Sequence, residues 1–133
     1  MPDPRGVVAV FNASQDTVDM ICAELTGHGY RCVPGHVTDV KQGETDFIAF
    51  IEQENPQVIV WDISPPYDKN WAFFQLIRSS TALRGRGMVL TTTHKTHLDQ
   101  LAGENTGALE IIGKPYDLNL ISQAVGRAMP TRV

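Results

Sequence analysis

The sequence lacks the features that mark several large classes of protein. It contains no run of about 18 apolar residues, so nothing in it predicts a membrane span. Residues 1–6 have neither the charged region nor the apolar region of a signal peptide. The net charge of −4 argues against a nucleic-acid partner, which would require a basic surface. We therefore expect a cytoplasmic protein that binds neither membranes nor nucleic acids.

Cysteine and histidine, the common metal ligands, are also scarce. Cys22 and Cys32 match no metal-binding or redox spacing, and we expect both thiols to be reduced. His94 and His97 are close in sequence but form only a weak pair, so they predict no metal site.

The composition is that of one ordinary globular domain. The chain has 133 residues, of which 42% are hydrophobic and 20% charged, which suffices for a core without internal staples. No internal repeat, linker or low-complexity segment interrupts it. We expect a single domain spanning residues 1–133, with no output domain.

Apolar patterns of two kinds alternate along the chain. Five short apolar runs predict strands, at residues 7–11, 30–33, 58–61, 88–90 and 109–112. Five segments with helical periodicity follow them in turn, around residues 18–25, 44–53, 71–77, 96–103 and 118–125, with Ser14 as N-cap of the first. Such alternation predicts a parallel sheet with right-handed crossovers and helices on both faces.

Polar side chains stand at the ends of three predicted strands. Asp62 follows the third strand, Thr92 the fourth and Lys114 the fifth. The carboxyl ends of parallel strands lie at one edge of a sheet, where ligands bind. A carboxylate, a hydroxyl and an ammonium together would suit phosphoryl chemistry, as acceptor, hydrogen-bond donor and countercharge. Taken singly, each has an ordinary structural explanation: a turn aspartate, a strand threonine and a solvated lysine.

With these residues in this order, the chain resembles the receiver domain of two-component response regulators, in its chemotaxis-regulator-like form. The resemblance covers roughly residues 7–129 and includes Pro66 after Asp62 and the Lys114-Pro115 pair. It implies a flavodoxin-like three-layer α/β sandwich with strand order 2-1-3-4-5 and five helices. It also implies a cis peptide before Pro115.

The resemblance assigns a role to each of the three polar residues. Asp62 would be the phosphoacceptor and Lys114 the lysine that contacts the phosphoryl group. Thr92 would be the switch residue because it lies 22 residues before Lys114, with Thr91 as the alternative. The implied function is a non-enzymatic, stand-alone receiver in a phosphorelay. Its partners would be a histidine kinase or phosphotransfer protein and a downstream protein target, and a homodimer is left open.

The chain departs from the family where magnesium would bind. The family's acidic pair after the first strand falls on Asn12 and Ala13. Magnesium prefers hard, mostly anionic oxygens. Without the acidic pair, its protein ligands would be Asp62, the Ser64 carbonyl and Asn12. We therefore expect weak magnesium binding, with Lys114 as the cation nearest Asp62.

Three further positions bear on that departure and on activation. Asp16 and Asp68 are candidate surrogate acids, although Asp16 is better explained by the first turn of a helix. Ile111 stands where the family has a mobile aromatic ring, and it predicts an ordinary core residue.

Two other classes of function remain as alternatives. The first is a pseudo-receiver, a protein-interaction module that needs neither phosphate nor metal. The second, a flavin or nucleotide binder, is disfavoured because the loop over residues 12–17 contains no glycine to cradle a phosphate.

Overall fold

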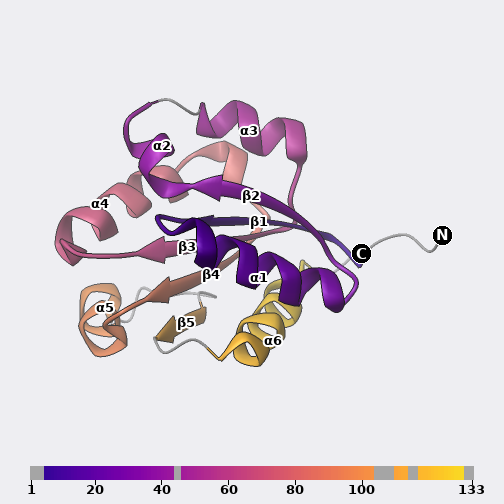
Figure 1. Cartoon of the computed structure of the whole chain (residues 1–133). Helices are drawn as coiled ribbons and strands as arrows, with labels where there is room; N and C mark the ends of the chain where they lie inside the picture. The colour runs from indigo at the N-terminus through magenta and orange to yellow at the C-terminus, as the bar shows by residue number, and fades with distance from the viewer. Residues whose placement is uncertain (1–4, 44–45, 104–109, 114–116, 131–133) are drawn as a thin grey trace.

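A five-stranded parallel sheet forms the centre of the molecule (Figure 1). The computed structural model describes residues 5–43, 46–103, 110–113 and 117–130. The strands are β1 (Val7–Asn12), β2 (Arg31–His36), β3 (Val58–Ile63), β4 (Gly87–Thr92) and β5 (Glu110–Gly113). Their order is β2-β1-β3-β4-β5, which confirms the predicted flavodoxin-like α/β fold. The strands contain apolar runs because helices cover both faces of the sheet.

Six α-helices connect and flank the strands in the described ranges, where the sequence predicted five. They are α1 (Gln15–Gly27), α2 (Val37–Lys41), α3 (Phe47–Glu54), α4 (Tyr67–Arg78), α5 (Lys95–Ala102) and α6 (Leu118–Ala128), and a 3₁₀ turn covers Thr81–Leu83. The unpredicted helix is α2, which has 5 residues and buries only Val37 and Val40. Five residues make little more than one helical turn, which is too short for an apolar pattern to repeat.

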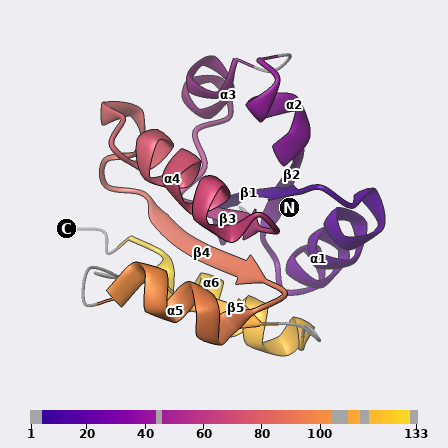
Figure 2. The ribbon, with the colours of Figure 1, turned by 90° about the vertical axis from the view of Figure 1, so that its left-hand side faces the viewer.

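The helices form one layer on each face of the sheet. On one face, α1 and α6 pack their apolar sides over Val8, Val10, Val58, Val60 and Val89. On the other, helices α2 to α5 enclose a core around Trp61, whose ring lies 5.2 Å from that of Phe11. Figure 2 looks onto the carboxyl ends of the strands, with α4 and α5 toward the viewer.

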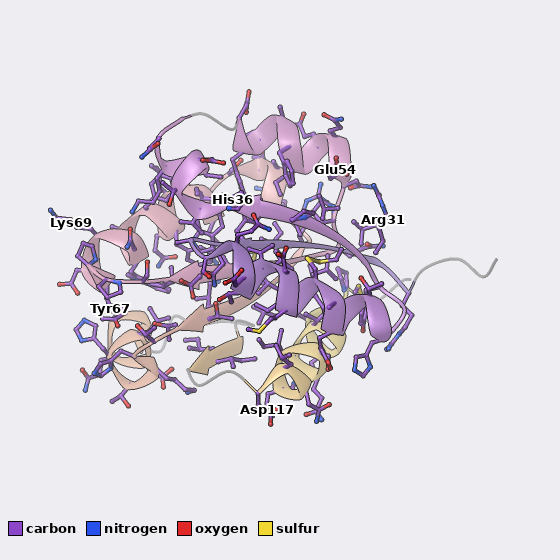
Figure 3. All side chains as sticks on the ribbon, viewed as in Figure 1. Arg31, His36, Glu54, Tyr67, Lys69 and Asp117 are labelled. Atoms are coloured by element: carbon purple, nitrogen blue, oxygen red, sulfur yellow. A yellow bond between two sulfur atoms is a disulfide. The ribbon has the colours of Figure 1, made fainter. Side chains whose placement is uncertain are left out.

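Strand β2 lies at an edge of the sheet and extends beyond its prediction. It contains Pro34, which is tolerated at an edge because no neighbouring strand needs its missing N–H. A side chain at Gly35 would collide with the ring of Phe11, so this position requires glycine. Arg31 at the start of β2 pairs with Glu54 of α3 at 3.4 Å (Figure 3).

The two cysteines form a disulfide, so the expectation of reduced thiols was wrong. Cys22 lies in α1 and Cys32 in β2, with their Cα atoms 5.5 Å apart. The helix packs against this part of the sheet, which brings together residues 10 apart in sequence. Their spacing matches no cysteine motif, so only the tertiary contact reveals the pairing.

No helix within the described ranges is both long enough and apolar enough to cross a membrane.

Candidate functional site

Asp62 and the two threonines lie at the carboxyl edge of the sheet, at the centre of the strand order. In the parallel register Asp62 is opposite Thr91, and Ile63 is opposite Thr92. Thr92 is in turn opposite Gly113, the last residue of β5. Strands β3 and β4 extend further than predicted, so all three residues belong to strands rather than to the loops beyond them.

Strand alternation directs Asp62 and Thr91 to the same face. They follow Val60 and Val89 by two residues, and both valines contact the α1 and α6 layer. The Thr91 hydroxyl donates a hydrogen bond of 2.8 Å to Oδ1 of Asp62. Asp62 retains 7% of its exposure and Thr91 none, so this charge-assisted bond is largely shielded from water.

Thr92 has a different environment from its neighbour. It follows Met88 and Leu90 in the alternation, which face the opposite helical layer. Its hydroxyl oxygen accepts a 3.3 Å hydrogen bond from the backbone N–H of His94. The structure therefore joins Thr91, the alternative switch residue, to Asp62, and the role of Thr92 stays a prediction.

The fifth strand leads to Lys114, which lies outside the described residues together with the peptide bond before Pro115. The cis peptide bond of the described chain is between Pro65 and Pro66, in the loop after Asp62. Ile111 is half-buried against the core around Trp61, in agreement with its prediction as a core residue.

The residues at the predicted magnesium position do not fit this ion. The Asn12 side-chain oxygen accepts a 3.0 Å hydrogen bond from the N–H of Ser14, and Ala13 has no ligand atom. The Ser64 carbonyl accepts a 2.6 Å hydrogen bond from Nδ2 of Asn70. Magnesium would have to compete for both neutral oxygens, with Asp62 as its anionic ligand.

Neither surrogate acid changes this conclusion. Asp16 is exposed in the first turn of α1, where the helix dipole favours it. Asp68 lies in α4, and its Oδ1 is 3.2 Å from Nε2 of His97 in α5. No cluster of three or more His, Cys, Asp or Glu suited to a metal exists in the part of the chain described.

Sequence reasoning missed Asn70, which contacts the loop after Asp62, and Lys41, which contacts Asn70. Nζ of Lys41 donates a 2.6 Å hydrogen bond to Oδ1 of Asn70, and Asn70 in turn donates to the Ser64 carbonyl. Lys41 and Asn70 are 29 positions apart, and no motif links them. The sequence held one signal, a polar residue four positions before Phe74, on the helix face where an apolar residue is expected.

The first residue of α4 contacts the loop after β4 and the helix α5 that follows it. The Tyr67 hydroxyl shares a hydrogen bond with the Thr93 hydroxyl, and the Tyr67 ring lies 5.3 Å from that of His97. Tyr67 is labelled in Figure 3 at the end of the molecule where α4 and α5 lie. These contacts join the start of α4 to the segment that follows Thr92.

Comparison with known proteins gives a fold relationship. No protein-family model matches the sequence, and no curated protein sequence matches it. The chemotaxis response regulator CheY4 of Vibrio cholerae superposes with a TM-score of 0.71 at 18% identity, over 92% of this chain and 98% of that one. A transiently phosphorylated switch in bacterial signal transduction gives 0.71 at 22% identity, over 94% of both chains.

A third solved structure agrees with these two. A response regulator from Thermotoga maritima gives a TM-score of 0.70 at 15% identity, over 96% of this chain and 98% of that one. At such identities the likeness concerns the backbone arrangement. The chain is similar in fold, over nearly its whole length, to the receiver domains of response regulators.

Proposed function

We propose that this chain is a receiver domain of two-component signalling that accepts a phosphoryl group on Asp62. The observation that carries the proposal is the Asp62 carboxylate at the carboxyl end of the central strand, hydrogen-bonded to the Thr91 hydroxyl. The fold shared with response regulators supports the same reading. On this fold, ligands are expected where the strand order reverses, and Asp62 in β3 lies there, next to β1.

The proposed reaction moves a phosphoryl group from nitrogen to oxygen. An oxygen of Asp62 forms a bond to phosphorus as the P–N bond of a phosphohistidine breaks, and the released imidazole nitrogen keeps the electron pair and takes a proton. The Thr91 hydroxyl, already directed at Asp62, could then donate to a phosphoryl oxygen. Lys114 would supply positive charge to that group, and Thr92 remains the alternative hydroxyl.

The partners follow from this reaction. A histidine kinase or phosphotransfer protein would donate the phosphoryl group, and a downstream protein would bind the surface formed by α5, β5 and α6. We place this exchange in the cytoplasm and treat the chain as a non-enzymatic signalling protein, with a homodimer left open. The Cys22–Cys32 disulfide is more typical of an oxidising compartment. A count of free thiols in protein taken from cells tests the location, because the cytoplasm would keep both cysteines reduced.

A second function is favoured by the engaged oxygens around Asp62. The Asn12 amide oxygen and the Ser64 carbonyl already accept hydrogen bonds from the protein. A site whose oxygens already accept hydrogen bonds within the protein suits a pseudo-receiver that binds its partner without phosphate or metal.

Labelling by a small phosphodonor separates the two functions. The wild-type protein and Asp62→Asn are incubated with phosphoramidate or acetyl phosphate, with and without magnesium, and their intact masses are measured. The first proposal expects one phosphoryl group on the wild type and none on Asp62→Asn. A folded wild-type protein that stays unlabelled under all conditions supports the pseudo-receiver instead.

A further inference from the structure

We propose that Lys41, acting through Asn70, holds the loop after Asp62 in place, so that the site at the carboxyl ends of the strands does not need a bound divalent cation. The proposal rests on the proposed function only in taking the Asp62 edge as the functional site. Lys41 and Asn70 are positioning residues in this proposal, because each acts on the Ser64 carbonyl rather than on a substrate.

The three groups form a directed chain of hydrogen bonds. Nζ of Lys41 lies 2.6 Å from Oδ1 of Asn70, and Nδ2 of Asn70 lies 2.6 Å from the Ser64 carbonyl oxygen. An ammonium can only donate and a carbonyl can only accept. The amide of Asn70 therefore has one orientation that satisfies both neighbours, with its oxygen toward Lys41 and its nitrogen toward Ser64.

Burial gives this chain its strength. Asn70 retains 7% of its exposure, and a buried amide left without partners would be costly. Its backbone N–H donates to the Pro66 carbonyl at 3.0 Å, the first helical hydrogen bond of α4, so it is the side chain of Asn70 that reaches beyond the helix to Ser64. The Asn70 side chain thus ties the Ser64 carbonyl to the first turn of α4.

Lys41 is brought to this position by the helix that the sequence did not predict. It is the last residue of α2, which is anchored to the core by Val37 and Val40. Lys41 is an exposed residue, so its ammonium reaches Asn70 from the surface. A hydrogen bond from a charged donor is stronger than one between neutral groups, and it also polarises the amide toward donation.

This arrangement opposes the binding of a metal cation. The Ser64 carbonyl is one of the three ligands predicted for magnesium, and it now accepts an N–H. A cation at this oxygen would compete with Asn70 and would be repelled by the Lys41 ammonium, which is two hydrogen bonds away. The ammonium supplies, from within the chain, part of the positive charge that an ion would bring.

The experiment compares Lys41→Met with Lys69→Met. Lys69 is an exposed lysine at the outer side of α4, next to Asn70 in sequence, and its loss changes the net charge equally (Figure 3). Two quantities are measured by NMR on ¹⁵N-labelled protein without any phosphodonor. These are the solvent exchange of the Asn70 side-chain amide protons and the apparent magnesium affinity from shifts near Ser64. Lys41→Arg tests rescue by a donor of the same charge.

In Lys41→Met we expect the Asn70 amide protons to exchange about tenfold faster and magnesium to bind several-fold more tightly than in Lys69→Met. Lys41→Arg should restore wild-type values of both. Equal exchange rates in the two methionine variants, or equal magnesium affinities, would overturn the proposal. Because no phosphodonor is present, either outcome is independent of whether Asp62 accepts a phosphoryl group.

Discussion

Replacing Thr91 with valine removes the hydroxyl that donates to Asp62 and preserves the branched shape of the side chain. Thr91 is fully buried and lies in β4, so valine fits the same strand position. The lost interaction is a 2.8 Å hydrogen bond to a carboxylate that retains 7% of its exposure. Removing such a bond from a buried charged acceptor costs about 1.5–3 kcal/mol.

The assay is equilibrium unfolding in urea at neutral pH, repeated for a double-mutant cycle with Asp62→Ala. We expect Thr91→Val to lower the free energy of unfolding, and the coupling between the two positions to be about 1.5 kcal/mol or more. The cycle is needed because Asp62 has an interaction beyond the one with Thr91, and a single replacement would mix the two.

Thr92→Val is the matched control for this prediction. Its hydroxyl is equally buried, but it accepts a longer 3.3 Å hydrogen bond from the backbone N–H of His94. We expect its coupling to Asp62→Ala to be close to zero, because the two side chains face opposite layers. A coupling larger for Thr92 than for Thr91 would refute the assignment of Thr91 as the hydroxyl that contacts Asp62.

Three further predictions concern the ion, the lysine and the disulfide. Asn12→Asp with Ala13→Asp should raise magnesium affinity at least tenfold, because each added negative charge at about 4 Å from a divalent ion contributes roughly 8 kcal/mol at an effective dielectric near 20 before desolvation. An unchanged affinity in a calorimetric titration would contradict the conclusion that Asn12 and Ala13 weaken magnesium binding. Lys114→Met should make Asp62 easier to protonate and weaken any partner response to phosphorylation, and identical NMR titrations of Asp62 would leave Lys114 a surface lysine. Reducing the Cys22–Cys32 bond, which spans 10 positions, should cost about 3 kcal/mol and lower the melting temperature by roughly 10 °C, with Cys22→Ser/Cys32→Ser as the comparison. Equal melting temperatures with and without reductant would show that the bond adds no stability.

The fold could be predicted because its signals are local. Runs such as Val58–Ile63 are apolar at every position except Asp62, and the spacing of Val18, Ile21 and Leu25 repeats at one helical face. Ser14 was expected to cap α1, and its hydroxyl accepts the N–H of Thr17 at 3.3 Å. Asp62 was identified in the same way, as a carboxylate at the end of an apolar strand.

The details of the site depend on contacts that no local pattern contains. Thr91 and Thr92 are adjacent and chemically identical, and only the strand register decides which one faces Asp62. The contact of Lys41 with Asn70 requires the short helix α2, which the sequence did not predict. The Cys22–Cys32 bond likewise depends on the packing of α1 against β2.

The measurement that tests the central claim most directly is the intact mass of the wild-type protein and of Asp62→Asn after exposure to a small phosphodonor. The account predicts a gain of one phosphoryl group in the wild type, located on Asp62 by peptide mapping, and no gain in the variant. Labelling retained in folded Asp62→Asn, or a folded wild type that is never labelled, would contradict it.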